Sequence, residues 1–376
     1  MLTIGGEPVL TIDSDAHVIE SEQTWSYLAP AEEKWRPLLF GSPADPVRQY
    51  WVIEEKIRGL RFPNLNAQAL AELSERTGRD MNTDQGAREM ASAALRLQHM
   101  DELGIDVQVL HNTLWIEQVT GRPDAEAALC RSYNRWLADI WAHGNGRLRW
   151  SCLPPTLSIP DAIEEIRWCK AHGTVGVCLR PLEGDRHLTD PYFYPLYEEA
   201  QRLDLPLTVH IANGNPQNAD LVRHSRFWTF RVPTVSACQN YLVSEVPALF
   251  PKLRIGFIEA GAQWLPWVLH ESKRRGLGRL AFDEMLREQR VWVTCENEDD
   301  LAYVIACAGE DNLLIGTDYG HTDPSSNLRA LSTFVERTDV ADAVKKKIVN
   351  DNARAYYGIQ DDELPAPHPR QALAVG

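Results

Sequence analysis

Basic side chains are scarce in this sequence. The 376 residues include 38 lysines and arginines against 53 aspartates and glutamates, which gives a formal net charge of −15. A protein that binds nucleic acid by releasing counterions from phosphates needs clustered lysine and arginine, and the sequence has no such stripe or tail. We therefore expect no nucleic-acid partner.

Long apolar runs are also missing. No stretch approaches the roughly 18 consecutive apolar residues of a membrane-spanning helix. The first residues, MLTIGGEPVLTIDSDAH, lack the basic segment and long apolar segment of a secretory signal. These absences predict a cytoplasmic protein without a membrane partner.

Paired cysteine motifs are absent too. The seven cysteines form no CxxC pair, and the closest two are nine residues apart. This spacing argues against a zinc knuckle or a thioredoxin-like motif and favours reduced, buried thiols. Tryptophan, in contrast, is abundant, with 12 residues. So many indoles either fill a large core or line an apolar pocket, and composition does not decide between the two.

Eight short apolar runs alternate with segments whose apolar residues recur at helical spacing. Such alternation indicates βαβ units and a parallel sheet, and eight repeats favour a closed barrel over an open sheet. We predict an α/β protein with one elaborated (β/α)8 TIM barrel over residues 1–376. The predicted strands are residues 9–12, 107–110, 148–153, 175–179, 206–209, 254–258, 291–294 and 312–315, and the predicted helices are residues 160–171, 192–203, 264–273, 298–308 and 340–356.

Two segments depart from this alternation. Residues 20–94 mix proline, tryptophan and polar residues over a length that exceeds an ordinary connection. We predict that they form an insertion of helices and loops after strand one, which acts as a lid over the barrel mouth. Residues 360–376 are rich in proline and polar side chains, so we expect a tail that is loose or wraps a partner subunit.

The predicted strands end in residue types that bind metal ions. Catalytic residues of such barrels lie at the carboxyl ends of the strands. Asp15 and His17 are two residues apart, so in extended backbone both point to one face and can bind one cation. Alone, this pair could equally be a surface turn. The later strand ends, however, carry His111, Arg180, His210, Glu259, Glu296 and Asp318, with His321 close behind.

Asp318 ends the last predicted strand. An aspartate there can bind a cation and accept a proton from a water that the cation activates. The alternative is that Asp318 caps a helix beginning near Pro324, but Thr322 and Asp323 are better placed for that cap. The position favours a functional aspartate.

Six segments together carry a family resemblance: IDSDAHVIE, RLQHMDELGID, GVCLRPL, DPYFYPLYEEAQRLDLPLTVHI, FIEAGAQWLPWVL and LLIGTDYGHTD. They resemble the amidohydrolase superfamily. They are similar to the branch that contains aminocarboxymuconate-semialdehyde decarboxylase, the resorcylate decarboxylases and many metal-dependent hydrolases. The resemblance runs over residues 11–357 and implies a metal-dependent barrel enzyme, often a homodimer. Because this branch includes decarboxylases, hydrolases and hydratases, it does not specify the reaction.

The resemblance implies metal ligands at four positions. Asp15 and His17 correspond to the family's strand-one metal motif, His210 to its strand-five histidine, and Asp318 to its catalytic, metal-binding aspartate. Where the decarboxylases have a histidine after strand six, this sequence has Glu259. The lost histidine would polarise the leaving carboxylate, so its absence argues against decarboxylation.

Glu259 adds a third carboxylate to Asp15 and Asp318. Three negative charges beside two histidines suit one or two divalent ions, with iron, zinc or manganese as candidates. Other branches bridge two metals with a carbamylated lysine after strand four, but Arg180 stands there. If two ions bind, we expect Glu259 to bridge them.

The leading hypothesis is a hydrolase that uses a metal-activated water on a hydrophobic or aromatic ester, thioester or amide, such as a thioesterase of secondary metabolism. Asp318 would deprotonate the water, while His210 or Arg180 would stabilise the oxyanion. One alternative is a non-oxidative decarboxylase of an aromatic or unsaturated acid, in which Asp318 protonates carbon. A second is an inactive barrel used for binding. The predicted substrate contacts are His111, Trp115, Glu296 and His321.

Overall fold

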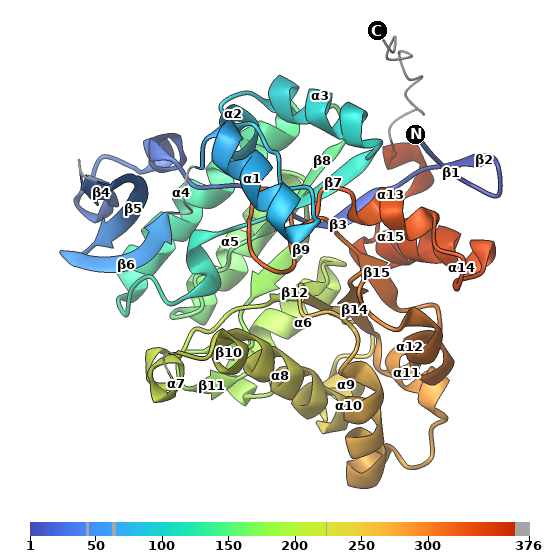
Figure 1. Cartoon of the computed structure of the whole chain (residues 1–376). Coiled ribbons are helices and arrows are strands. Elements are labelled where there is room, and N and C mark those ends of the chain that lie inside the picture. The colour runs from blue at the N-terminus through green and yellow to red at the C-terminus, as the bar shows by residue number, and fades with distance from the viewer. Residues whose placement is uncertain (43–44, 62–64, 223, 365–376) are drawn as a thin grey trace, which may run out of the picture.

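The computed structural model describes residues 1–42, 45–61, 65–222 and 224–364, and a barrel of eight strands lies at its centre (Figure 1). All neighbouring barrel strands pair in parallel, in the order β15-β14-β13-β12-β9-β8-β7-β3. This topology confirms the predicted α/β barrel. The strands are β3 (Ile12–His17), β7 (Val107–His111), β8 (Leu148–Cys152), β9 (Thr174–Leu179), β12 (Leu207–His210), β13 (Ile255–Ile258), β14 (Val291–Cys295) and β15 (Leu313–Ile315).

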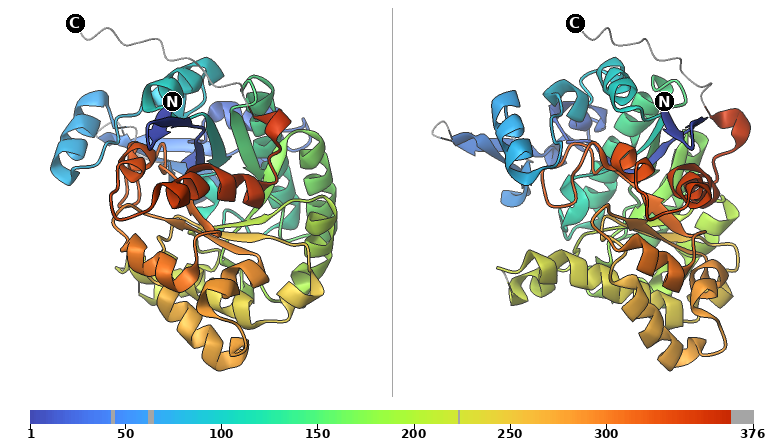
Figure 2. Two further views of the ribbon diagram at one scale, coloured as in Figure 1. Left: turned by 90° about the vertical axis from the view of Figure 1, so that its right-hand side faces the viewer. Right: turned by 45° about the vertical axis from the view of Figure 1, so that its right-hand side comes forward.

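Helices cover the outside of the barrel (Figure 2). Two of them, α4 (Pro123–Ala142) and α5 (Ile159–Ala171), have proline in the first turn, where the missing N–H costs no hydrogen bond. The predicted helix 340–356 is continuous but contains a π-helical turn over Lys347–Asp351. The other helices are α6 (Tyr194–Arg202), α7 (Pro216–Leu221), α8 (Val232–Val243), α9 (Val246–Leu249), α10 (Leu265–Ser272), α11 (Met285–Gln289), α12 (Leu301–Ala308), α13 (Ala330–Val335), α14 (Asp342–Lys346) and α15 (Asn352–Tyr357).

The first barrel strand lies later in the chain than residues 9–12, so that prediction is wrong. Val9 belongs to a small hairpin of β1 (Leu2–Ile4) and β2 (Glu7–Val9), and β3 begins at Ile12. All six residues of β3 are buried, although the sequence IDSDAH is mostly polar. Hydrophobic patterning misses this strand because its side chains serve a buried polar site.

The seam between the first and last strands has no regular ladder. The backbone N–H of Asp318 donates to Asp15 O at 2.8 Å, and the N–H of His17 donates to Tyr319 O at 2.8 Å. An isolated bridge pairs Ala16 with Tyr319. These contacts join the two ends of the barrel sheet directly beside the candidate site.

The segment 20–94 contains a three-stranded antiparallel sheet in addition to helices and turns. Its strands β4 (Leu38–Ser42), β5 (Asp45–Ile53) and β6 (Lys56–Arg61) were not predicted, and helices α1 (Ala67–Thr77) and α2 (Gln85–Arg88) follow before α3 (Ala93–Leu103). Trp25 and Trp51 are buried with ring centroids 5.6 Å apart, and Trp25 also lies 5.9 Å from Trp115 of the barrel. Aromatic packing therefore attaches this insertion to the barrel.

The abundant tryptophans mostly fill the core. Trp25, Trp51, Trp136 and Trp150 are among the largest fully buried side chains. All seven cysteines are free, and six are buried. Within the described ranges no helix has the length and apolarity to span a membrane. The predicted tail falls largely on residues 365–376, which lie outside the described residues.

Candidate metal centre

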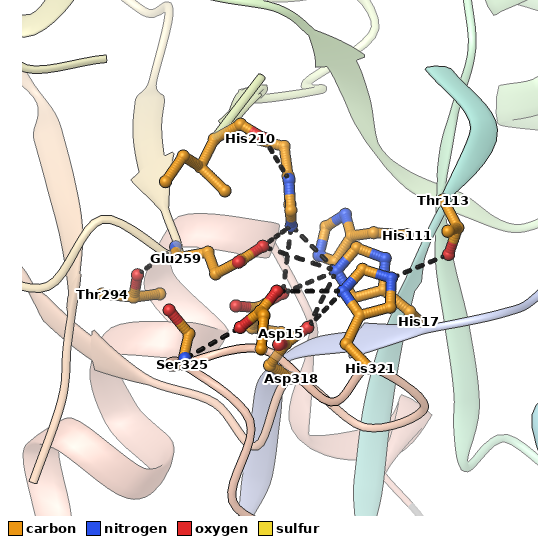
Figure 3. Close-up of polar contacts among 12 residues, drawn as sticks. Asp15, His17, His111, Thr113, His210, Glu259, Thr294, Asp318, His321 and Ser325 are labelled. Atoms are coloured by element: carbon orange, nitrogen blue, oxygen red, sulfur yellow. Dashed lines mark hydrogen bonds and ion pairs between the residues drawn. The ribbon is translucent and has the colours of Figure 1, made fainter. Parts of the chain in front are cut away.

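Carboxylates and imidazoles from four strands converge at the carboxyl end of the barrel (Figure 3). Asp15 and His17 come from β3, and His210 ends β12. Glu259 directly follows β13, and Asp318 lies three residues after β15. All five are nearly inaccessible to solvent. The structure thus brings together every residue that the sequence analysis predicted as a metal ligand.

The side-chain atoms of this centre are within coordination reach of one another. His17 Nε2 lies 2.9 Å from His210 Nε2 and 3.4 Å from one oxygen each of Asp15 and Asp318. His210 Nε2 lies 3.3 Å from Asp15 Oδ1 and 3.1 Å from Glu259 Oε2. Donor atoms about 2 Å from a common ion are separated by such distances.

The imidazole orientations fit a cation. His17 Nδ1 lies 2.7 Å from the carbonyl of Asn112, and His210 Nδ1 lies 3.2 Å from that of Ile211. A carbonyl only accepts, so each Nδ1 carries the hydrogen and each Nε2 presents a lone pair. Burial lowers the pKa of His17 to about 3, which keeps this ring neutral. Two lone pairs facing each other repel, and a cation between them removes the conflict.

The carboxylates also fit a cation. Burial, followed by the charges of neighbouring carboxylates, raises the pKa of both Glu259 and Asp318 well above the usual range. Ser326 Oγ donates to Asp318 Oδ2 at 2.6 Å, and the Glu259 backbone N–H donates to Thr294 Oγ1 at 2.7 Å. Clustered buried carboxylates are stable when protonated or when bound to cations.

Both acids also have unusual backbone conformations. Glu259 has φ 67° and Asp318 has φ 49°, in the left-handed region that non-glycine residues seldom adopt. Residues held in this region cost about 1 to 3 kcal/mol each and concentrate at functional sites. The conformation turns each side chain from the strand end towards the centre.

A buried polar network holds together the backbone segments that carry the candidate ligands. The sequence analysis did not predict this network. Asp13 accepts hydrogen bonds from Thr317 Oγ1 at 2.6 Å and Gln108 Nε2 at 2.8 Å. Gln108 Oε1 accepts in turn from Arg96 Nε at 2.7 Å, and Arg96 Nη2 donates to His17 O at 3.1 Å. The network fixes β3, which carries two candidate ligands, against β7 and the loop after β15.

The four predicted substrate contacts have different surroundings. The His111 ring lies 5.5 Å from the His210 ring, and the His321 ring stacks on His17 at 3.8 Å. Trp115 packs against Trp25 and Tyr133. Glu296 lies outside the cluster, where its carboxylate accepts from Ser325 Oγ at 3.2 Å and from Arg231 at 3.3 Å.

Arg180 does not point its donors at the centre. Its guanidinium binds the carboxylate of Glu183 through Nε at 3.0 Å and through Nη2, and Nη1 donates to Glu117 O at 3.1 Å. These bonds occupy the groups that would stabilise an oxyanion. Arg180 thus forms a buried ion pair with Glu183, three residues later, and with Trp115 it lines a small cavity, while its catalytic role stays a prediction.

Glu126 lies behind this ion pair, 3.9 Å from Arg180, and burial raises its pKa from 4.5 to about 7. The folded protein thus keeps a proton that the unfolded chain releases near pH 4.5, so this group's contribution to stability is lost as pH rises towards 7. The shift corresponds to about 3 kcal/mol. Glutamine never ionises. We therefore expect the free energy of unfolding of Glu126→Gln, relative to that of the wild type, to rise by about 3 kcal/mol between about pH 5 and pH 8, as measured by urea unfolding.

Glu164, an exposed glutamate, provides the control for this experiment. Glu164→Gln should leave the pH dependence of the urea midpoint unchanged. An identical pH dependence in Glu126→Gln and in the wild type would contradict the buried-proton explanation.

Comparisons with known proteins agree on a family. The sequence model of the family described as Amidohydrolase matches residues 12–359. A gamma-resorcylate decarboxylase of Rhizobium radiobacter is 26% identical over 288 residues, which cover 70% of this chain and 86% of the relative.

Solved structures share the fold. An amidohydrolase from Mycobacterium avium subsp. paratuberculosis superposes with a TM-score of 0.74 at 19% identity, covering 94% of this chain and 99% of the other. A dihydroxybenzoic acid decarboxylase from Polaromonas sp. JS666, with bound manganese and the inhibitor 2-nitroresorcinol, gives a TM-score of 0.63 at 20% identity, covering 95% and 99%.

Proposed function

Because the chain belongs to the amidohydrolase family, whose sequence model spans residues 12–359, we propose that it is a metal-dependent decarboxylase of an aromatic or unsaturated carboxylic acid. The names of its relatives favour this reaction over the hydrolysis that the sequence analysis placed first. The observation that carries the proposal is the buried cluster of carboxylates and imidazoles at the carboxyl end of the barrel, in which Asp318 Oδ1 lies 3.4 Å from His17 Nε2.

The residues of the centre fit a divalent cation of the manganese, iron or zinc type. Asp15, His17, His210, Glu259 and Asp318 offer oxygen and imidazole nitrogen donors that such ions accept. When bound, the cation would supply Lewis-acid binding of the substrate carboxylate and of an adjacent hydroxyl.

Asp318 is placed to act as the general acid. Burial and the neighbouring carboxylates raise the pKa of Asp318 above its usual range, which favours the proton-carrying form that a general acid needs. In the proposed reaction this proton is transferred to the ring carbon that bears the carboxylate. The carbon–carbon bond then breaks, its electron pair returns to the ring, and carbon dioxide leaves. A proton from solvent restores Asp318.

His111 is proposed to bind a substrate hydroxyl. Its Nε2 lies 3.2 Å from Ser14 O, which only accepts, so Nε2 carries the hydrogen and Nδ1 is an acceptor. Nδ1 is buried and has no hydrogen-bond partner among the described residues. Burial lowers the pKa of His111 to about 3, so the ring stays neutral and accepting. A ring hydroxyl of the substrate would satisfy this nitrogen.

The direct test is carbon dioxide release from the isomeric dihydroxybenzoates and from unsaturated dicarboxylates, using manganese-loaded protein. We expect release from at least one aromatic acid, and loss of release after chelation. Turnover of none of these acids, in protein shown to contain metal, would contradict decarboxylation.

Glu259 favours a second candidate, the hydrolase of the original hypothesis. Glu259, 3.1 Å from His210 Nε2, stands where the decarboxylases have a histidine, and a hydrolase in which Asp318 deprotonates water needs no histidine there to polarise a leaving carboxylate. The same preparations should be offered aryl esters and aromatic acyl thioesters. Ester or thioester turnover without carbon dioxide release would replace the decarboxylase by this hydrolase.

Metal loading should stabilise the fold, because the cation binds a cluster that exists only in the folded state. At a manganese concentration of 100 times Kd the gain is about 2.7 kcal/mol. We expect chelator-treated protein to unfold at a lower temperature than manganese-loaded protein in a calorimetric scan. Asp15→Asn should reduce the difference, and equal Tm values for treated and loaded wild type would contradict a metal centre here.

A further inference from the structure

The buried hydroxyl of Ser326 fixes one oxygen of the Asp318 carboxyl group. Ser326 Oγ lies 2.6 Å from Asp318 Oδ2, and it accepts from the backbone N–H of Asp323 at 3.2 Å. Because an N–H only donates, the one hydroxyl hydrogen of Ser326 is left for Asp318. The other carboxyl oxygen, Oδ1, faces His17 Nε2 at 3.4 Å. The bond from Ser326 therefore determines which oxygen of Asp318 faces the centre.

We propose that Ser326 is a positioning residue for Asp318. Two arginines, Arg79 and Arg231, hold Ser326 in place. The inference rests on the general-acid role that the proposed function gives to Asp318, and it extends that function to residues outside the candidate ligands. The arginines come from different parts of the chain. Arg79 lies in the insertion between α1 and α2, and Arg231 ends the π-helical turn Phe227–Arg231 that precedes α8.

Arg79 holds the backbone of the loop that carries Ser326. Its Nη1 donates to the carbonyl oxygens of Asp323 at 2.7 Å and of Ser326 at 3.3 Å. The base of the loop is closed by the N–H of Asn327, which donates to Thr317 O at 2.9 Å. One guanidinium nitrogen thus ties two carbonyls of the same loop together, and Ser326 cannot shift without breaking these bonds.

Arg231 holds the adjacent residue of the loop, Ser325. Its Nη2 donates to Ser325 Oγ at 3.1 Å and to Glu296 Oε1 at 3.3 Å. Ser325 Oγ donates in turn to the same glutamate oxygen at 3.2 Å, so guanidinium, hydroxyl and carboxylate form a closed triangle of hydrogen bonds. Arg231 Nη1 also donates to Ala260 O at 2.7 Å. The guanidinium therefore connects the loop after β15 to the backbone that follows β13.

Asp318 depends on such support because its backbone is strained. Its φ of 49° lies in the left-handed region, where residues persist only if the surrounding contacts over-determine the conformation. A reacting group that is displaced by about 1 Å can lose about 100-fold in rate. The hydrogen bond from Ser326 therefore affects the reaction as well as the fold.

Ser326→Ala tests the proposal. We expect kcat for carbon dioxide release to fall by about 10- to 100-fold with KM nearly unchanged, and the Kd for manganese to rise by about tenfold or more. The electron paramagnetic resonance signal of free Mn²⁺ reports this Kd without any turnover. Ser326→Cys keeps the volume of the side chain but donates weakly, so it should show the same changes even where Ser326→Ala does not fold.

Ser332→Ala is the matched control. The hydroxyl of Ser332 donates to the backbone carbonyl of Arg329 on an exposed surface, so this variant loses a serine hydrogen bond away from Asp318. It should behave as the wild type in kcat, KM and manganese affinity.

A double-mutant cycle tests whether Arg231 acts through Ser326. Arg231→Met alone should lower kcat by about tenfold, but it should have little further effect in the Ser326→Ala background, because the hydroxyl that it positions is gone. The same cycle applies to Arg79→Met, and either cycle can be followed by the manganese Kd. An arginine that lowers kcat and manganese affinity by the same factor in both backgrounds would have no positioning role through Ser326.

Ser326 variants with wild-type kcat and wild-type manganese affinity would overturn the proposal. That result, together with carbon dioxide release by the wild type, would leave the decarboxylase standing without the positioning residue. Weakened manganese binding by Ser326→Ala, in a protein that turns over no acid, would leave the positioning residue standing without the decarboxylase.

Discussion

Asp318→Asn is expected to lower kcat for the substrate by about 1000-fold, because general acid catalysis by a positioned side chain contributes on this scale. Asparagine keeps the shape of the side chain and can still accept from Ser326, which donates to Asp318 Oδ2 in the wild type. It cannot carry the proton that decarboxylation delivers to carbon. The measurement is steady-state carbon dioxide release at saturating manganese, with kcat and KM determined separately.

Metal content must be followed in the same variant, since Asp318 is also a candidate ligand. Elemental analysis of the assayed samples separates loss of the acid from loss of the ion. Asp283→Asn, at an exposed aspartate outside the barrel mouth, is the matched control and should keep kcat unchanged. A metal-loaded Asp318→Asn variant with kcat within tenfold of the wild type would remove Asp318 from the chemistry.

Arg96→Met is expected to destabilise the fold by about 3 to 5 kcal/mol, the cost of removing one partner from a buried charged network. The guanidinium is fully buried, donates to Gln108, Ala87 O and His17 O, and stacks on the Tyr319 ring at 3.4 Å. Methionine fills much of the volume but leaves all three acceptors without a donor. Urea unfolding at constant pH measures the loss.

Arg76→Met provides the control for the same chemical change on an exposed helix surface, and it should alter stability by less than about 0.5 kcal/mol. Arg96→Lys should recover part of the loss, since lysine restores the charge but not the fork of donors. Equal stability of Arg96→Met and Arg76→Met would show that the network below the metal centre does not support the fold.

The alternation of strands and helices was predictable because most barrel strands are apolar on both faces. The run 291–294, for example, corresponds to β14 (Val291–Cys295), all of whose residues are buried. β3 was misplaced because its buried residues are polar. The insertion sheet was missed because its strands depend on antiparallel pairing with one another, and Leu38 and Phe40 remain exposed within it.

The candidate ligands were predictable from their positions after strands, because parallel strands bring their carboxyl ends to one edge. The buried hydrogen-bond network that holds these ligands in place was not predictable. Asp13 forms hydrogen bonds with Gln108, 95 residues away in the sequence, and with Thr317, 304 residues away. No local sequence pattern predicts such bonds. The ion pair of Arg180 had an available signal in the sequence, since Glu183 lies three residues later and binds its guanidinium.

The seam between β3 and β15 has a consequence for the order of folding. Contacts between residues 304 positions apart, such as Asp13 with Thr317, close a loop of most of the chain and are entropically expensive to form early. A nascent chain therefore exposes Asp15, His17, His210 and Glu259 long before residue 318 is synthesised. We expect barrel closure and assembly of the complete ion-binding cluster to be one late event, so that a chain truncated before β15 has most of the ligands but no finished centre.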